Sequence, residues 1–502
     1  MVVWSSSSSK AQAFDMRETA PQAASEHMYE KNIQEKYSGG LSMAVPGEIA
    51  GLHEAWLRHG RLPWRTLFSP SIKLAEQGFT VSPFLAQKIA QREEDILQDE
   101  GLQAILAPEG KLLRAGDICR NIELAKTLKA IAEEGPKALY NGTVGKNLVA
   151  DVRKAGGILT MEDLRNYNVN IMDPLEVKVM DHTIHGMPPP STGTIALSMI
   201  SNILSEYRSH DAFAGDLSVH RLVEAFKHMY AVQMNLGDPK FEDIDFYVRE
   251  MMSKSYARDV RAKIVDNTTF PSSYYTPRWS QLRDHGTSHF SIVDSERNAV
   301  SMTTTINYLF GARILSASTG IVLNNGMADF ASPNENSPDK LPPAPANYIK
   351  PNKRALSSMT PLIITKDGEV VGAMGGSGGL LIIPAVVQVF LNSVVLRMEP
   401  FHAVERARVY PKLIPNIVYY ENWTVFNGDH IELREERVRF LKERGHQLQS
   451  MMAGAIVQLV IRTTKGSVEP NRRSLPGDPP ITVTFTGVSD PRRVERRPPF
   501  EM

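Results

Sequence analysis

Apolar residues follow different spacings in the two parts of the chain. In the first part, residues 52–60 and 220–239 carry apolar positions at helical spacing, and Gly237 and Pro239 predict the end of the second helix. From residue 286 onward, polar and apolar residues alternate instead. We therefore expect a helix-rich part followed by a strand-rich part.

The alternation begins directly after a Gly-Thr pair, Gly286-Thr287. The segments 287–294 and 298–306 flank a short polar connection, which predicts a β-hairpin. Further strands are expected at 320–325, 362–365 and 369–374. Because Gly286 and Thr287 lie where one part ends and a strand begins, a break in the chain there need not damage either part.

Two stretches lack a clear period. Residues 335–353 are rich in proline, and long loops of this kind often act as lids or binding loops. The chain turns polar after residue 466, and the charged segment 489–502 is expected to be a loose tail.

Composition narrows the class of protein. The chain has 502 residues, of which 42% are hydrophobic and 22% are charged, which is typical of a globular protein with a large core. Lys+Arg and Asp+Glu both number 56, so no basic face for nucleic acid is implied. Cys119 is the single cysteine, which excludes an internal disulfide.

The sequence offers little evidence on location. The most apolar run, 380–391, contains Pro384 and is too short to span a bilayer, and residues 1–10 do not resemble a signal peptide. Three N-x-[ST] sequons, at Asn141, Asn267 and Asn422, are candidate glycosylation sites.

Two motifs invite a chemical interpretation. His53 and His59 are six residues apart, whereas a helical zinc motif needs a spacing of four, so a surface helix is favoured and no metal site is predicted. The glycine-rich segment 372–379 lacks the lysine of a phosphate-binding loop. It predicts either a tight turn after a strand or a pair of backbone N–H groups that form an oxyanion hole.

Thr287 is the strongest candidate for a nucleophile. A threonine hydroxyl needs a neighbouring base, and a free α-amine on the same residue can act as one because its pKa is about 7.7–8.0. This chemistry requires that the chain be cut between Gly286 and Thr287. The alternative is that the pair forms an ordinary turn before a strand.

Several motifs in combination resemble the γ-glutamyltranspeptidase (glutathione hydrolase) family. They are GLSMAVPGEIAG, HGRLPW, LGDPKF, GTSHFSIVD, TTINYLFG, LSSMTP and AMGGSGG, and the match runs from about residue 11 to 465. The resemblance implies an N-terminal nucleophile hydrolase fold, a four-layer α/β/β/α sandwich. It also implies self-cleavage into a large subunit, 1–286, and a small subunit, 287–502, which form a heterodimer.

The implied reaction moves the γ-glutamyl group of glutathione or its conjugates to water, an amino acid or a dipeptide, without a metal or an organic cofactor. By this resemblance, Thr287 is the nucleophile and Thr305 orients it. The backbone N–H groups of Gly375 and Gly376 stabilise the oxyanion.

The resemblance also assigns the substrate's α-amino acid end. Arg17, Ser357 and Ser358 would hold the α-carboxylate, since a guanidinium grips a carboxylate with two parallel bonds. Asn307 and Asp329 would receive the α-ammonium.

The chain departs from the family pattern at three places. Gly326 stands where the family usually has Glu or Gln, and Ala328 replaces a frequent acid. We therefore expect weaker glutamyl binding unless another side chain substitutes. Family members carry more chain before the matched region, so folding and self-cleavage are expected to suffer if those core elements are absent. The tail also differs from the family's glycine-rich ending.

Two alternatives remain at this point. The chain could be an inactive or truncated relative with a binding role, or an amidase for another acyl group, although Arg17 favours an α-amino acid. Family resemblance implies a glycoprotein at the outer face of the plasma membrane.

Overall fold

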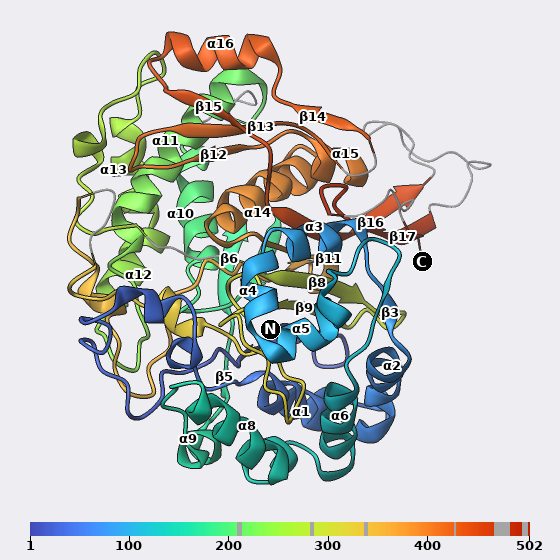
Figure 1. Cartoon of the computed structure of the whole chain (residues 1–502). Coiled ribbons are helices and arrows are strands. Elements are labelled where there is room, and N and C mark those ends of the chain that lie inside the picture. Colours follow the sequence, from blue (N-terminus) through green and yellow to red (C-terminus); the bar gives the residue numbers. More distant parts are fainter. Residues whose placement is uncertain are drawn as a thin grey trace.

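The computed structural model describes residues 1–207, 213–281, 286–335, 340–425, 428–465, 482–493 and 500–501 (Figure 1). Two antiparallel sheets face each other at its centre. One has five strands in the order β5-β2-β1-β9-β8, and the other has seven in the order β18-β17-β16-β11-β10-β7-β6. Strand β11 packs across β8 and β9 to join the two sheets.

The strands of the first sheet are β1 (Val2–Ser5), β2 (Lys10–Asp15), β5 (Asn170–Met172), β8 (Ser288–Val293) and β9 (Ala299–Thr304). Those of the second are β6 (Leu175–Val179), β7 (His182–Gly186), β10 (Leu362–Lys366), β11 (Glu369–Ser377), β16 (Ile456–Lys465), β17 (Thr482–Val488) and β18 (Phe500–Glu501). Smaller sheets use β3 (Phe79–Thr80) with β4 (Ile118–Cys119), and β12 (Val409–Pro411), β13 (Val418–Thr424), β14 (His430–Glu432) and β15 (Leu448–Met451).

Both main sheets combine strands from the two sides of residue 286. In the first sheet β1 pairs with β9, with Val3 opposite Val300, and in the second β7 pairs with β10, with Ile184 opposite Ile364. The helix-rich and strand-rich parts therefore build one shared core. They are not two separately folded domains.

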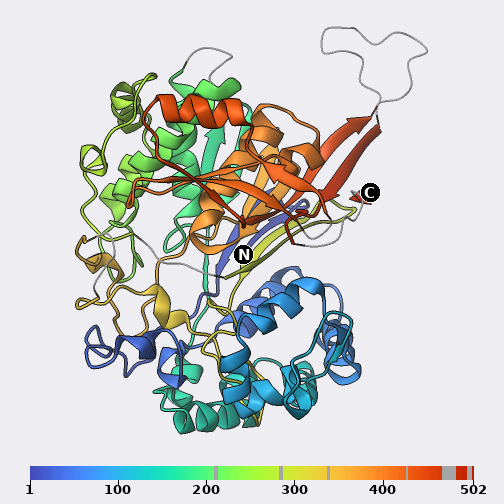
Figure 2. The same cartoon turned by 45° about the horizontal axis from the view of Figure 1, so that its top comes forward.

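Helices cover the outer face of each sheet, as Figure 2 shows. Over the seven-stranded sheet lie α10 (Gly193–Ser205), α11 (Gly215–Gln233), α12 (Asp245–Met252), α13 (Lys254–Lys263), α14 (Ile382–Phe390), α15 (Pro400–Glu405) and α16 (Glu435–Glu443). On the side of the five-stranded sheet lie α1 (Glu48–His59), α2 (Trp64–Gln77), α3 (Pro83–Ala90), α4 (Glu93–Gln98), α5 (Glu100–Leu106), α6 (Ile122–Glu134), α7 (Lys137–Tyr140), α8 (Thr143–Lys154) and α9 (Met161–Asn166).

The core follows these layers. The largest buried cluster joins α10, α11 and α14 to the seven-stranded sheet, with Phe226, Ile364 and Phe390 fully buried. A second cluster lies between the sheets and includes Trp4 and Ala373. The predicted four-layer α/β/β/α sandwich is therefore confirmed.

The hairpin was predicted correctly as β8 and β9, and β11 continues three residues beyond the predicted 369–374. The expected strand at 320–325 is wrong, because only an isolated bridge between Leu315 and Val322 forms there. Among the described helices, none is both long and apolar enough to cross a bilayer.

The expectation of a loose tail is wrong for part of segment 489–502. Arg492 has a fully buried side chain that pairs with Glu421 at 2.6 Å and with Asp490 at 2.9 Å. Asp490 also accepts from Arg408 at 2.7 Å. Burial alone would raise the pKa of Asp490, but Arg492 and Arg408 lower it. These ion pairs fix residues 489–493 against β13 and β16.

Candidate functional site

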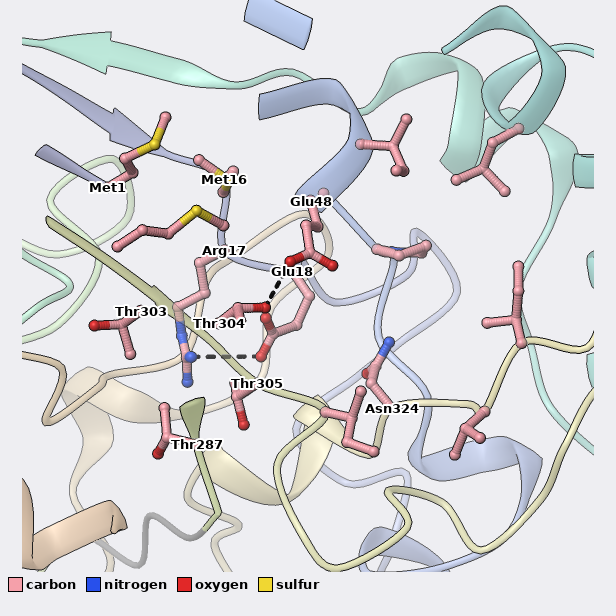
Figure 3. Close-up of a pocket in the computed structure, with 18 of the residues that line it drawn as sticks. Met1, Met16, Arg17, Glu18, Glu48, Thr287, Thr303, Thr304, Thr305 and Asn324 are labelled. Atoms are coloured by element: carbon pink, nitrogen blue, oxygen red, sulfur yellow. Dashed lines mark hydrogen bonds and ion pairs between the residues drawn. The ribbon is translucent and has the colours of Figure 1, made fainter. Parts of the chain in front are cut away.

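Thr287 lies on the wall of a cavity of about 300 Å³. It directly precedes β8, and Thr305 directly follows β9, so the hairpin brings the two hydroxyls to the same end. Arg17, Glu18 and Ser357 line the same cavity, and Figure 3 shows Arg17, Glu18, Thr287 and Thr305 facing one another.

A chain of hydrogen bonds ends on the carbonyl group that precedes Thr287. The backbone N–H of Asn307 donates to Thr305 Oγ1 at 2.7 Å, and the Thr305 hydroxyl donates to the carbonyl oxygen of Gly286. A Cβ atom at Gly286 would lie 2.6 Å from the carbonyl oxygen of Asn307. The site thus requires glycine at 286 on steric grounds and polarises its carbonyl.

Arg17 is buried beside the cavity and forms a direct ion pair with Asp329. Its Nη2 lies 2.6 Å from Asp329 Oδ2, and its Nε donates to the carbonyl oxygen of Ala355 at 2.8 Å. Asp329 lies at the end of the 3₁₀ helix η6 (Gly326–Asp329) and is 3% exposed. The predicted cation and anion of the site are therefore in contact with each other.

Asn307 links the hairpin to Asp329. Its Nδ2 donates to Asp329 Oδ1 at 2.9 Å, and its side chain is buried. Its Oδ1 is buried and accepts no hydrogen bond from the described residues. The backbone of Asn307 has a φ of 74°, in the left-handed region, which asparagine adopts more readily than most residues. The buried acceptor without a partner is the feature that suggests a functional position.

The two predicted serines lie in the loop before β10. The backbone N–H of Met359 donates to Ser357 Oγ at 3.2 Å, and Thr192 holds the carbonyl oxygen of Ser357 through its backbone N–H at 2.9 Å. Ser358 is 1% exposed. Ser357 therefore contributes directly to the cavity wall, whereas Ser358 lies behind it.

Gly375 and Gly376, the predicted oxyanion hole, lie inside β11, opposite Gln458 and Val457 of β16. Consecutive N–H groups of an extended strand point to opposite edges, and the role of this pair stays a prediction. A Cβ atom at Gly375 would lie 2.3 Å from the His289 ring, so this glycine provides space for His289.

The next glycines, Gly378 and Gly379, lie where the chain leaves β11. Their φ angles are 130° and 59°, and they lead into η8 (Gly379–Leu381) and α14. Val293 shares a core cluster with Ala373, and His289 lies over Gly375. Continuing along β8 from His289 to Thr287 leads along β11 from Gly375 toward Gly376.

The first residue of α14, Ile382, lines the cavity with Thr287. Because N–H groups at a helix start have no partner within the helix, they attract negative charge. The N–H of Ile382 itself donates to the carbonyl oxygen of Gly379, so the predicted oxyanion pair remains Gly375 and Gly376.

No pattern in the sequence singled out Glu18. A Cβ atom at Gly326 would lie 2.6 Å from Glu18 Cγ and 2.7 Å from Glu18 Oε1. The Glu18 side chain thus occupies the space that a side chain at 326 would need. The only available signal was the missing side chain at 326, and the contact joins segments that are far apart in the sequence.

His220, Glu224 and His446 form a buried cluster that the sequence analysis also missed. His220 Nδ1 lies 2.8 Å from His446 Nε2, and His220 Nε2 lies 2.9 Å from the carbonyl oxygen of Val265. Lys227 Nζ lies 3.3 Å from both Glu224 and His446. Because this ammonium already supplies a cation and the ring nitrogens have partners, we interpret the cluster as structural.

The remaining candidates lie away from the cavity. Asn141, Asn267 and Asn422 are exposed, as glycosylation requires, and their modification stays a prediction. Cys119 is buried, and burial raises the pKa of its thiol.

Comparisons with known proteins agree with this geometry. A family model described as gamma-glutamyltranspeptidase matches residues 1–498. Glutathione hydrolase 3 of Arabidopsis thaliana is 55% identical over 500 residues, which cover 98% of this chain and 78% of that protein. Glutathione hydrolase 2 of the same plant is 51% identical over 457 residues, covering 90% of this chain and 79% of that protein.

Solved structures share the fold. A cephalosporin acylase from Bacillus halodurans has a TM-score of 0.79 at 23% identity, over 98% of this chain and 84% of that chain. The gamma-glutamyltranspeptidase of Helicobacter pylori has a TM-score of 0.50 at 31% identity, over 53% of this chain and 77% of that chain. The architecture is therefore of the predicted N-terminal nucleophile hydrolase type, and the chain belongs to the γ-glutamyltranspeptidase family.

Proposed function

We propose that the protein is a glutathione hydrolase and γ-glutamyltransferase that first cuts itself between Gly286 and Thr287. The hydrogen bond from the Thr305 hydroxyl to the Gly286 carbonyl carries this proposal. It polarises the peptide bond that must break, and Thr287 is the next residue. An ordinary turn before a strand has no need of such a donor.

The Thr287 hydroxyl acts first in self-cleavage and later in turnover. Its Oγ adds to the Gly286 carbonyl carbon while Thr305 stabilises the developing oxyanion. The C–N bond then breaks, and the hydroxyl proton ends on the released α-amine of Thr287. Water hydrolyses the resulting ester, which leaves a carboxylate on Gly286. The two products, 1–286 and 287–502, stay together as a heterodimer.

In turnover, the free amine of Thr287 takes the proton of its own hydroxyl. Oγ attacks the γ-carbonyl carbon of glutathione, and the departing amine receives the proton. Water or an acceptor amino acid or dipeptide then resolves the γ-glutamyl ester. The backbone N–H groups of Gly375 and Gly376 stabilise the oxyanion, an effect typically worth about 3–4 kcal/mol per donor.

The α-amino acid end of the donor binds on the Arg17 side of the cavity. Arg17 and Ser357 hold the α-carboxylate, with Ser358 behind them. Asn307 and Asp329 receive the α-ammonium, and Asn307 Oδ1 accepts no hydrogen bond from the described residues. A site that supplies both a cation and an anion favours a γ-glutamyl donor, which carries an α-amino acid end, over a simple acyl group.

The first test is intact-mass analysis of purified wild type beside Thr287→Ala. We expect two fragments from the wild type, the smaller beginning at Thr287, and a single chain from the variant. Thr287→Ser is the matched control, because it retains a hydroxyl and should still cut. Glutathione hydrolysis should accompany cutting in each variant. An uncut wild-type chain would contradict the proposal.

A second test concerns the residue before the cut. A side chain at 286 would collide with the carbonyl oxygen of Asn307, so Gly286→Val should cut far more slowly than wild type. A time course of fragment formation measures this directly. Cutting at the normal rate would show that glycine has no role there.

We further propose that the protein acts at the outer face of the plasma membrane as a glycoprotein. The exposed sequons at Asn141, Asn267 and Asn422 support this. Treatment of the protein from its native source with an endoglycosidase should lower its mass. An unchanged mass would contradict glycosylation.

A further inference from the structure

Two carboxylates flank Arg17, and their surroundings differ. Asp329 has a side chain that is 1% exposed, and it accepts from Arg17 Nη2 at 2.6 Å and from Asn307 Nδ2 at 2.9 Å. Glu18 lies 3.5 Å from Arg17 Nη1, and its side chain is 14% exposed. Of these two, it is Glu18 that lines the cavity with Thr287.

The Glu18 carboxylate lacks the donors that Asp329 has. Its Oε1 is buried and accepts no hydrogen bond from the described residues. Buried carboxylate oxygens almost always have hydrogen-bond donors, so an oxygen without one beside a cavity indicates a ligand that supplies it. A cationic donor suits this position best, because a charge-assisted bond is roughly twice as strong as a neutral one.

Gly326 allows Glu18 to occupy this position. A Cβ atom at 326 would lie 2.6 Å from Glu18 Cγ and 2.7 Å from Oε1. These distances are too short for real contacts, so any larger residue at 326 would displace Glu18. The Asn324 side chain fixes the start of η6, because its Oδ1 accepts from the backbone N–H of Gly326 at 2.9 Å.

We infer that Glu18 is a second carboxylate, in addition to Asp329, that receives the α-ammonium group of the γ-glutamyl donor, in the space left by Gly326. This inference rests on the proposed function. Arg17 and Glu18 then present a cation and an anion side by side on one cavity wall, complementary to the zwitterionic end of an α-amino acid (Figure 3).

The alternative is that Glu18 serves only as a counter-ion for Arg17. The two interpretations differ in what they predict for ligands without an amine. A counter-ion affects glutamate and glutarate equally, since both carry the carboxylate that Arg17 binds. An ammonium receptor affects glutamate alone.

The first experiment measures binding of L-glutamate and glutarate by calorimetry to wild type and Glu18→Gln. Wild type should prefer glutamate, and Glu18→Gln should weaken glutamate binding by about tenfold to a hundredfold while glutarate binding stays the same. Glu48→Gln is the matched control, because Glu48 also lines the cavity but already accepts from Thr304 Oγ1 at 2.7 Å. It should keep the preference for glutamate.

A kinetic experiment uses γ-glutamyl and glutaryl anilides. Glu18→Gln should raise KM for the γ-glutamyl donor with little change in kcat, and it should leave the glutaryl donor unaffected. Self-cleavage, measured by intact mass, reports that the variant folds.

The contact with Gly326 provides a double-mutant cycle. Gly326→Ala should lower the preference for glutamate because it displaces Glu18. In the Glu18→Ala background the same change should have no further effect. Gly326→Glu combined with Glu18→Ala should restore part of the preference, since it returns a carboxylate to the same space.

The outcomes separate the two proposals. If wild type cleaves no γ-glutamyl donor but its preference for glutamate depends on Glu18, the proposed activity fails, and Glu18 remains the ammonium receptor of a glutamate-binding site. If wild type is active and Glu18→Gln keeps the full preference, the inference fails alone. Absence of any glutamate preference in wild type would also overturn it.

Discussion

Two buried arginine-carboxylate clusters can be compared within this molecule. In the tail cluster of Arg408, Glu421, Asp490 and Arg492, each of the four carboxylate oxygens accepts two hydrogen bonds. In the cavity cluster of Arg17, Glu18, Asn307 and Asp329, the Glu18 Oε1 and Asn307 Oδ1 atoms accept none from the described residues.

This difference shows how to distinguish a charged cluster that stabilises the fold from one that binds a ligand. Residue type and burial are similar in the two clusters, so neither property identifies a site. Carboxylate oxygens that all accept hydrogen bonds indicate a cluster that stabilises the fold, although Arg408 Nε in the tail cluster has no partner among the described residues. Unsatisfied oxygens beside a cavity indicate a cluster that awaits a ligand.

The largest expected effect comes from matched Glu→Gln changes in the two clusters. Glu421→Gln should lower the free energy of unfolding by about 3–5 kcal/mol, because it leaves buried arginine charge uncompensated. Glu18→Gln should change it by less than about 0.5 kcal/mol. Urea unfolding of the uncut Thr287→Ala chain measures both. Equal losses would remove the distinction between the clusters.

Asp329→Asn tests the one carboxylate of the cavity cluster that has its hydrogen bonds. The variant loses the charge that holds Arg17 at 2.6 Å, so the glutamyl donor should bind more weakly by about 1.5–3 kcal/mol. Initial-rate kinetics should show this as a raised KM. An unchanged KM would show that Arg17 needs no positioning.

Acid should weaken both regions through buried histidines. Burial lowers the pKa of His289, beside the cavity, to about 3, and that of His446, in the structural cluster, to about 2. Between these values and about 6.5, the unfolded chain is protonated at these positions while the folded chain is neutral. Stability is therefore complete above pH 6.5 and falls below it by about 1.4 kcal/mol per pH unit for each histidine.

Urea midpoints measured from pH 7 to pH 5 check this slope. His289→Asn should reduce the slope of the unfolding free energy against pH by the contribution of one histidine, about 1.4 kcal/mol per pH unit. A stability that is independent of pH over this range would contradict the buried, neutral state of both rings.

The smallest effect is expected at Asn422, the neighbour of Glu421 on β13. Its side chain is exposed, so Asn422→Gln should change the free energy of unfolding by less than about 0.5 kcal/mol. The same unfolding assay gives a direct contrast with Glu421→Gln one residue away. A large loss at Asn422 would show that position on β13, rather than the ion cluster, determines stability.

Local pattern predicted the elements that position the nucleophile. A period of two over Ser288–Val293 and the polar connection after it predicted the hairpin, and therefore the proximity of Thr287 and Thr305. The period did not predict which face is buried, because Phe290 and Ile292 are exposed whereas His289 and Val293 are buried. The same approach failed at 320–325, where apolar residues face the core without a continuous strand partner.

Contacts between distant segments could not be predicted. Arg492 lies in a stretch so rich in charge that solvation was the natural expectation, yet its partners Glu421 and Asp490 bury it. The absence of a side chain at Gly326 was visible in the sequence. That Glu18 fills the space depends on a tertiary contact that no local pattern contains.

The shared sheets have a consequence for the two products of self-cleavage. Since β1 pairs with β9 and β7 with β10, separating residues 1–286 from 287–502 would break backbone ladders in both sheets at once. Labelled and unlabelled copies of the cut protein should therefore not exchange their halves unless the whole molecule unfolds. Hydrolysis of one peptide bond would create a new N-terminus, but the two halves would stay associated as one molecule.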